Sequence, residues 1–214
     1  MSYALFAIVE AALIASSLSL DAFTAGIAYG SNKTKIPMLS VIIINLICCA
    51  ITGISLFAGI FIKPYIPHDL TLIVSFIILF IIGSLKLLDS TTKSIIRKYS
   101  NFNKEIKGSA FNFKFVLNLY ANPEVGDLDA SKHISSIEAA LLALSLSLDG
   151  IIVGFGAALA NVNSVAVLLW SLVTNAMFLL IGHFIGGKIA SKTSFNISWL
   201  SGVALIGLAF AKLF

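Results

Sequence analysis

Four carboxylates stand in two segments that are otherwise uncharged and mostly apolar. Glu10 and Asp21 lie in the stretch EAALIASSLSLD, and Glu138 and Asp149 lie in the stretch EAALLALSLSLD. An ionised aspartate facing hydrocarbon costs at least ~2.5–3.5 kcal/mol on insertion scales, so both aspartates are expected to face the protein interior, where they favour a cation. The structural alternative is a protonated carboxyl that hydrogen-bonds to a serine or a backbone carbonyl and holds two helices together.

The two stretches are copies of each other. Ten of their twelve positions are identical, and the constant offset is 149 − 21 = 128 residues. The spacing of 21 − 10 = 11 residues from glutamate to aspartate makes about three helical turns with a rotation of only ~20°, so each copy predicts one acidic stripe on a helix. Ser17 and Ser145 lie one turn before the aspartates on this stripe, whereas Ser19 and Ser147 point roughly the other way. The repetition therefore predicts a duplicated unit with two equivalent aspartates.

Further oxygen ligands stand in the neighbouring apolar stretches. Asn45 and Asn175 occupy roughly corresponding regions of the two copies, at an offset of 175 − 45 = 130 residues. Carboxylate, amide and hydroxyl oxygens suit hard divalent cations such as Mn²⁺, Mg²⁺ or Ca²⁺. We therefore predict a metal site at the middle of the membrane, with the two glutamates at its opposite mouths. The predicted metal residues are Asp21, Asp149, Asn45, Asn175, Ser17, Ser145, Glu10 and Glu138.

The sulfur, imidazole and amine groups nearby have simpler interpretations. Cys48, Cys49 and His183 are interpreted as packing residues, which disfavours a soft Cu(I) site or a thiolate zinc site. Lys86 precedes Asp89 by three residues and is expected to pair with it or, as the stronger interpretation, to extend toward the lipid headgroups. None of these groups is predicted to belong to the metal site.

A second acidic cluster lies in the segment GDLDASKHISSIEA. Residues of ligand type stand at positions 1, 3, 5, 7, 9 and 12 of an EF-hand calcium loop, and they are Asp127, Asp129, Ser131, His133, Ser135 and Glu138. Lys132 occupies position 6, where a glycine usually makes the sharp turn, and Glu138 already has a counterpart in Glu10. The segment is thus either a cytoplasmic cation loop or an acidic cap on the N-terminus of the following helix.

The composition places these residues in a membrane protein. Of the 214 residues 58% are apolar and 11% are charged, and the mean hydropathy is +1.01, which is unlike the balance of soluble domains. Crossing the bilayer core takes roughly 20 residues, and six apolar stretches reach this length. The predicted spans are 4–30, 37–62, 70–89, 136–160, 164–187 and 196–213. Nucleic-acid binding is not expected despite the net charge of +4, because basic residues in such a chain set its membrane orientation.

Basic residues predict which loops face the cytoplasm. Lys33 and Lys35 follow the first span, many Lys and Arg residues fill the segment after the third, and Lys188 follows the fifth. By the positive-inside rule these loops are inside and both termini are outside. Because each copy has three spans, the second copy enters from the opposite side. The predicted fold is thus an all-α membrane protein with six transmembrane helices in two inverted-topology three-helix repeats. Its units are the first repeat (1–92), a cytoplasmic loop (93–135) and the second repeat (136–214).

Three short motifs carry a family resemblance. The segments SLSLDAF and SLSLDG, and the GSLKLL at the end of the third span, resemble the MntP family of manganese efflux pumps, and within it the YtaF-type sporulation membrane proteins. The resemblance covers nearly the whole chain. It implies export of Mn²⁺ through a six-helix inverted-repeat fold, with the family's aspartates of spans one and four at Asp21 and Asp149.

The expected function is that of a secondary transporter in the cell membrane. A divalent metal, Mn²⁺ above all, would leave in exchange for protons at the central aspartates, and the sequence has no Gly-rich phosphate loop that would bind ATP. No cofactor and no enzymatic activity are expected, since no nucleophile–base pair emerges. Two alternatives stay open: a non-transporting membrane scaffold in sporulation, and an exporter of another small cationic solute. The expected partners are the lipid bilayer, the metal ion and protons, and a homodimer is left open.

Overall fold

The computed structural model describes residues 3–88, 116, 119–120, 122–188 and 198–213. Within these residues the chain forms seven α-helices and two short 3₁₀ helices, and it forms no strand. The elements are α1 (Tyr3–Ser31), α2 (Met38–Ile62), η1 (Lys63–Tyr65), α3 (His68–Leu87), η2 (Pro123–Gly126), α6 (Ser136–Leu146), α7 (Leu148–Leu159), α8 (Ser164–Lys188) and α9 (Ser198–Leu213). The prediction of an all-α protein is confirmed for the described residues.

Prolines and a left-handed residue set the ends of the first helices. α1 ends at Ser31, and Lys33 two residues later has a φ of 58°, the left-handed turn that closes many helices. α2 begins directly after Pro37, and Pro67 directly precedes α3. Proline suits these places because it has no N–H to leave without an acceptor where a helix begins. The ends of the first three predicted spans accordingly lie within two residues of the observed ends of α1, α2 and α3.

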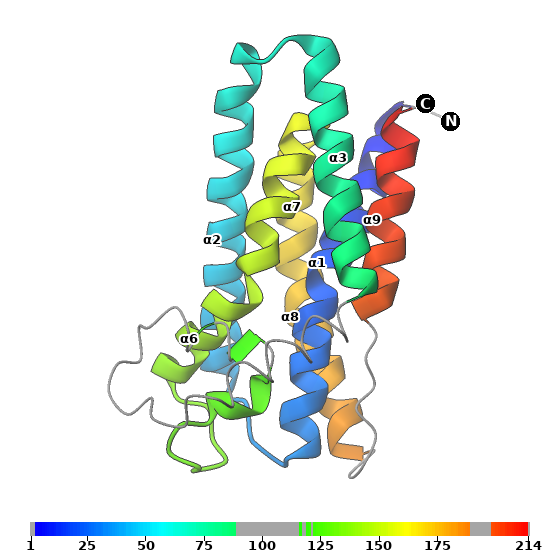
Figure 1. The fold of residues 1–214 in the computed structure, drawn as a ribbon. Coiled ribbons are helices and arrows are strands. Elements are labelled where there is room, and N and C mark those ends of the chain that lie inside the picture. Colours follow the sequence, from blue (N-terminus) through cyan, green and yellow to red (C-terminus); the bar gives the residue numbers. More distant parts are fainter. Residues whose placement is uncertain (1–2, 89–115, 117–118, 121, 189–197, 214) are drawn as a thin grey trace, which may run out of the picture.

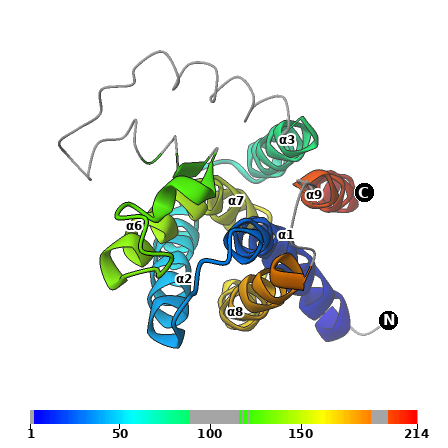
Figure 2. The same ribbon diagram turned by 90° about the horizontal axis from the view of Figure 1, so that it is seen from below.

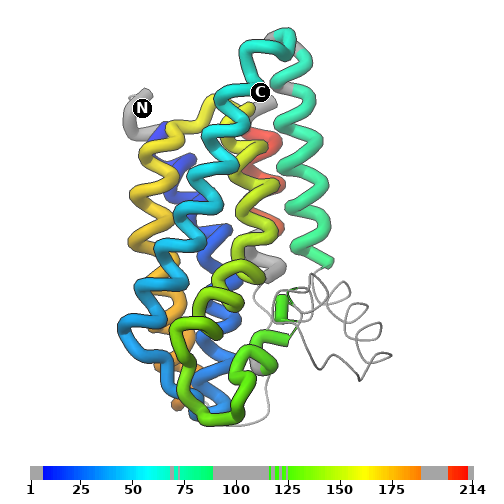
Figure 3. The backbone as a smooth tube through the Cα atoms, turned by 90° about the vertical axis from the view of Figure 1, so that its left-hand side faces the viewer, coloured from blue at the N-terminus to red at the C-terminus, as the bar shows by residue number. Residues whose placement is uncertain are grey.

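The helices run alternately up and down one bundle (Figure 1). α1 begins and α9 ends at one end of the bundle, whereas the α1–α2 connection, η2 and the start of α6 lie at the other end. Viewed along the bundle, α1 lies near the centre, with α7, α8 and α9 around it (Figure 2). α2 runs beside α6 and α7, and α3 runs beside α9 (Figure 3). Each helix of the first half therefore packs against helices of the second half.

Several helices are long and apolar enough to cross a membrane. Three meet this description, at Ala7–Ser31, Met38–Tyr65 and Ser164–Lys188, and α6 with α7 makes a fourth if the bent pair is one span. The two other predicted spans contain shorter apolar helices, Ile73–Leu87 and Gly202–Ala211. The protein is therefore a multi-pass membrane protein. Among the described residues it has three or four full spans, where the sequence predicts six.

The fourth predicted span is not one straight helix. α6 and α7 meet at Ser147 with a bend of 46°. The hydroxyl groups of Ser145 and Ser147 each donate to a backbone carbonyl three residues earlier, and such bonds bend helices because they compete with the backbone ladder. Gly150 follows where the first copy has Ala22, and glycine in a helix interior costs about 1 kcal/mol relative to alanine. The span predicted at 136–160 therefore consists of two helices, whereas the matching α1 is continuous.

Glycines bring the backbones of the two halves into direct contact. A methyl group on Gly26 of α1 would lie 2.4 Å from the carbonyl oxygen of Leu179 on α8. A methyl group on Gly182 of α8 would lie 2.3 Å from the carbonyl oxygen of Phe23 on α1. Small residues allow this close approach, which gives membrane helices their dispersion contacts. Gly154 of α7 approaches α2 closely as well, so the first helix of each half packs tightly on the second helix of the other.

Candidate functional site: a buried charged triad

Asp21 and Asp149 converge on the ammonium group of Lys86. Its Nζ lies 2.8 Å from Oδ2 of Asp21 and 2.5 Å from Oδ2 of Asp149. All three residues are buried, with exposed fractions of 3% for Asp21, 4% for Lys86 and 9% for Asp149. We call these three residues the charged triad. The structure thus brings the two repeated aspartates to one point, with a cation between them.

Each member of the charged triad comes from a different helix. Asp21 lies inside the long helix α1, Lys86 lies in the last turn of α3, and Asp149 lies in the first turn of α7, directly after the bend. Asp149 Oδ1 also accepts the N–H of Gly150 at 2.8 Å. The N-terminal end of a helix carries a partial positive charge that favours a carboxylate. The break between α6 and α7 therefore orients Asp149 and stabilises its charge.

The Lys86 side chain does not point where the sequence predicts. The prediction has this side chain paired with Asp89 or extended to the headgroups, but it points into the bundle and binds two carboxylates. Asp89 itself lies outside the described residues. The physical reason is that a buried carboxylate without a partner costs several kcal/mol, so a cation between the two aspartates is strongly favoured. The signal in the sequence is a lysine inside an apolar stretch, since intramembrane ionisable residues usually face the interior.

A small cavity with several polar side chains in its lining lies beside Asp149. Its volume is about 20 Å³, which suffices for about one water molecule. Asn45 of α2 and Asn175 of α8 meet in its lining, with Nδ2 of Asn175 donating to Oδ1 of Asn45 at 3.3 Å. Nδ2 of Asn45 donates in turn to the carbonyl oxygen of Leu172 at 2.8 Å. The remaining polar lining residues are Ser19, Cys48, Cys49, Thr52, Ser147 and Ser171. The two predicted amide ligands therefore lie together beside Asp149.

The serines that line the cavity are not the two that the sequence predicts as ligands. Oγ of Ser145 donates to a carbonyl oxygen of its own helix at 2.7 Å, and neither Ser17 nor Ser145 belongs to the described lining of the cavity. Ser19 and Ser147, which the helical stripe predicts to point away, line it instead. The reason is that α1 has two polar sides: Asp21 faces Lys86 of α3, whereas Ser19 hydrogen-bonds to Thr174 of α8 at 2.8 Å.

Cys48 and Cys49 both line the cavity, whereas the sequence predicts them only as packing residues. Their Sγ atoms also contact backbone carbonyl oxygens, at 3.6 Å for Cys48 and 4.0 Å for Cys49. Asn45, Cys48, Cys49 and Thr52 follow the i, i+3, i+4, i+7 spacing of one helix face. This polar stripe on the apolar helix α2 is a signal in the sequence for the lining of the cavity.

The repeated glutamates are buried and not exposed at the mouths of a pathway. Glu10 and Glu138 are each 4% exposed. Glu138 forms a capping box with Ser135 at the start of α6, in which each side chain accepts the backbone N–H of the other residue. Its Oε1 accepts the N–H of Leu128 at 2.7 Å. In this structure Glu138 therefore has the role of a helix cap, which differs from the expectation of two open mouths.

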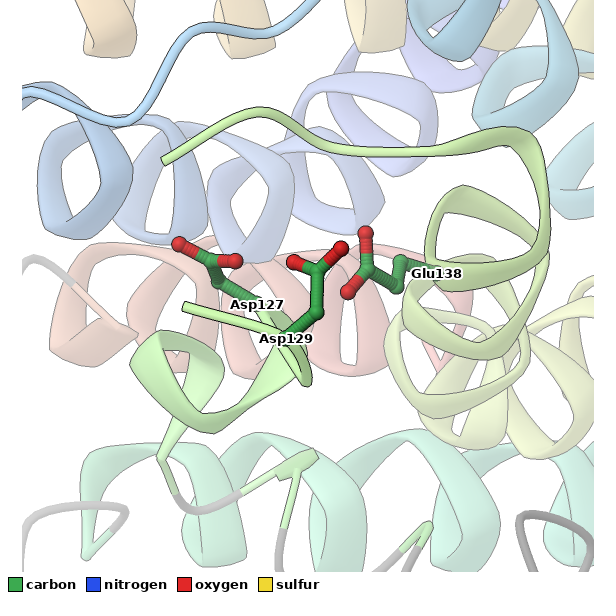
Figure 4. Close-up of side chains that lie close together, drawn as sticks. All are labelled: Asp127, Asp129 and Glu138. Atoms are coloured by element: carbon green, nitrogen blue, oxygen red, sulfur yellow. The ribbon is translucent and has the colours of Figure 1, made fainter. Parts of the chain in front are cut away.

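The acidic segment before α6 brings three carboxylates together (Figure 4). One oxygen from each of Asp127, Asp129 and Glu138 lies within 4.8 Å of the others. Lys132 has a φ of 57° and so makes the sharp turn that a glycine makes at position 6 of a calcium loop. Its N–H donates to Oδ2 of Asp127 at 2.9 Å. Oδ1 of Asp127 is buried and has no hydrogen-bond partner among the described residues.

Backbone and hydroxyl groups hold this loop in shape. Ser131 donates from its N–H to Oδ1 of Asp129 and from its Oγ to the carbonyl oxygen of His133, both at 3.0 Å. The side-chain and backbone hydrogen bonds of Ser131 hold the pKa of Asp129 below its ordinary value. Lys35, in the α1–α2 connection, forms an isolated parallel bridge with His133. Three of the predicted loop ligands thus converge, whereas Ser131 and His133 bond to each other.

The fold and the charged triad define a multi-pass membrane protein with a buried ionic site, an architecture typical of transporters. Comparison with known proteins agrees with this class. Residues 114–213 match the family Mntp, described as "Putative manganese efflux pump". The chain is 29% identical over 206 residues to the "Probable sporulation protein YtaF" of Bacillus subtilis (strain 168), a match that covers 94% of this chain and 97% of that protein. No solved structure matches. The resemblance to the MntP family and its YtaF-type members is thereby confirmed.

Proposed function

We propose that the protein is a secondary transporter that carries a divalent metal cation, with Mn²⁺ as the first candidate, out of the cell. The observation that carries this proposal is the charged triad, in which carboxylates from α1 and α7 converge on one cation in a site nearly free of solvent. Two carboxylate oxygens that meet at one point also suit a hard divalent ion. The family description names manganese efflux and so supports the same substrate.

The proposed release step is an exchange of the metal for protons. Asn45 and Asn175, whose amide groups lie beside Asp149, would complete the oxygen ligands. Two carboxylates buried together require a compensating positive charge, because uncompensated buried ions are costly. Protons and the metal therefore compete for the same oxygens, and a proton gradient would drive export.

We further propose that six membrane helices form two inverted repeats. The halves run in opposite directions through the bundle (Figure 1), and their contacts occur in the pairs that a two-fold relation requires. α1 packs on α8 as α7 packs on α2, and α1 packs on α9 as α7 packs on α3. Such repeats bind substrate at their interface and open it alternately to each side. Lys33 and Lys35 favour a cytoplasmic location for the α1–α2 connection, with both termini outside.

A second, separate binding function is proposed for residues 127–138. The convergence of three carboxylate oxygens and the buried Oδ1 of Asp127 support a hard cation such as Ca²⁺ or Mn²⁺ there. A cation in this cytoplasmic loop would report the internal ion level to α6. Calorimetric titration of Ca²⁺ into the purified protein tests the site: Asp127→Asn with Asp129→Asn should abolish a heat of binding that Asp21→Asn leaves intact. Equal binding by the loop variant and the unmodified protein would disprove it.

Manganese transport by the reconstituted protein tests the main proposal. Asp21→Asn and Asp149→Asn each remove one charge with little change in shape, and both should abolish Mn²⁺ entry into proteoliposomes that contain a quenchable dye. Asp69→Asn, the same chemical change at the start of α3, is the matched control and should transport normally. Full transport by both triad variants would refute the proposal. Normal transport with a sporulation defect after deletion within 93–115 would point instead to the scaffold function.

A further inference from the structure

The ammonium group of Lys86 occupies the place that the proposed substrate needs. Nζ lies 2.8 and 2.5 Å from the two Oδ2 atoms, and a hard divalent metal binds carboxylate oxygens at about 2.0–2.6 Å. An ion that used both oxygens would therefore lie at the position of Nζ or in contact with it. The neighbouring cavity of about 20 Å³ has room for about one water molecule and does not provide a second place for the lysine head beside a bound ion.

The net charge of the site also indicates that the ion and the Lys86 ammonium exclude each other. With both aspartates ionised, the charged triad has two negative groups and one positive group, so its net charge is 1 − 2 = −1. A divalent ion added beside the ammonium would bring the net charge to +1 and place two cations in contact. With the ammonium withdrawn, the ion and the two carboxylates balance to zero. A buried site strongly favours the balanced arrangement, because buried charges are stable only when they are compensated.

We propose that Lys86 is a tethered counter-ion, whose ammonium group and the transported cation take turns between Asp21 and Asp149. This inference rests on the proposed transport function. Lys86 lies in the last turn of α3, and its flexible four-carbon side chain can extend toward the headgroup region while keeping its charge. In the empty protein Lys86 then neutralises one carboxylate, so the site never holds two bare charges. When the ammonium returns, it displaces the ion from both oxygens.

Mn²⁺ binding to the purified protein tests this inference, with loss of the free-ion signal in electron paramagnetic resonance as the readout. Every protein compared, the one with an unmodified triad included, carries Asp127→Asn and Asp129→Asn, so that the proposed loop site does not contribute. Lys86→Met removes the competing cation and should bind Mn²⁺ at least ~10-fold more tightly, because a site that is mostly occupied by its own lysine has a reduced apparent affinity. Lys86→Arg keeps a cation in the triad and should bind no more tightly than the unmodified protein. Lys188→Met, at the exposed end of α8, is the matched control and should not change the affinity.

A second measurement needs no variant and so does not depend on the folding of Lys86→Met. Reductive methylation of lysines, followed by mass spectrometry of the peptide with Lys86, should show this residue protected without metal and severalfold more reactive at saturating Mn²⁺. The reactivity of Lys188 should stay constant. Unchanged Lys86 reactivity at saturating Mn²⁺, or equal affinity of Lys86→Met and the unmodified protein, overturns the inference and leaves the transport proposal standing. Mn²⁺ binding that Asp21→Asn and Asp149→Asn leave intact overturns both.

Discussion

Removing charges from the triad should change stability in an order that follows its net charge. With both aspartates ionised, the native triad has a net charge of −1, since one ammonium faces two carboxylates. Asp21→Asn or Asp149→Asn alone brings the net charge to zero and leaves one complete ion pair. Lys86→Met leaves a charge of −2, and the double Asn variant leaves an isolated ammonium. We therefore expect the single Asn variants to be at least as stable as the native protein, and the other two to be clearly less stable.

The size of the loss follows from the burial of the triad. All three residues are less than 10% exposed, so water does not compensate for a lost partner. Removing one side of a buried ion pair costs about 3–5 kcal/mol. For a chain of this length each kcal/mol lowers the melting temperature by about 2–4 °C. Lys86→Met should accordingly melt about 6–20 °C lower than the native protein in detergent.

Thermal unfolding with a thiol-reactive fluorescent dye measures this order directly. Cys48 and Cys49 are the two cysteines of the chain and are partly buried, so they react with the dye as the protein unfolds. Lys188→Met is again the control for loss of a lysine. A Lys86→Met variant that melts at the native temperature would refute the electrostatic reasoning. A single Asn variant that is as unstable as the double variant would refute it equally.

Three further predictions concern the helix cap, the helix contact and the acidic loop. Ser135→Ala removes the cap of α6 and should cost about 1 kcal/mol in the same unfolding assay, with Ser135→Thr as a control that retains a hydroxyl. Gly182→Ala places a methyl group 2.3 Å from a backbone oxygen of α1 and should cost about 1–3 kcal/mol. Gly207→Ala, inside α9 with nothing within 4 Å, should cost nothing and should stabilise by up to about 1 kcal/mol. The carboxyl of Asp129 should titrate below its ordinary pKa in ¹³C NMR because Ser131 hydrogen bonds favour its anion. The stability that this anion gives the folded protein is present at neutral pH and is lost as the pH falls through the lowered pKa. A titration midpoint at or above the ordinary pKa would contradict this prediction.

The sequence predicted the ends of the helices well where one local physical rule sets them. Apolar runs and prolines set the ends of α1, α2 and α3 to within two residues, because hydrophobic length and the missing N–H of proline act locally. The bend at Ser147 was not predictable from the same pattern. SLSL occurs in both copies, and only the second copy breaks. Gly150 in place of Ala22 is a local difference between the copies. The packing of α6 and α7 against α2 is a long-range contact that no local pattern contains.

The two carboxylates of the candidate site were predictable from the sequence, whereas the Lys86 ammonium between them was not. The exact repetition around Asp21 and Asp149 indicated equivalent places at the protein interior, and the structure does bring these two side chains to one point. Lys86 was missed because a lysine near the end of a span usually reaches the headgroups. Its actual direction depends on two carboxylates that are 65 and 63 residues away in the chain (86 − 21 = 65 and 149 − 86 = 63). Such a long-range contact cannot be predicted from helical periodicity.

The glycine contact between α1 and α8 also has a consequence for biosynthesis. Gly26 and Gly182 are separated by 182 − 26 = 156 residues, and a ribosome needs roughly 8–30 s to add them at ~5–20 residues per second. Throughout that time the first helix is inserted while its closest neighbour has not yet been made. A nascent chain must therefore hold α1 in the bilayer with its Gly26 face uncovered, and insertion factors or lipid have to cover that face until α8 is made.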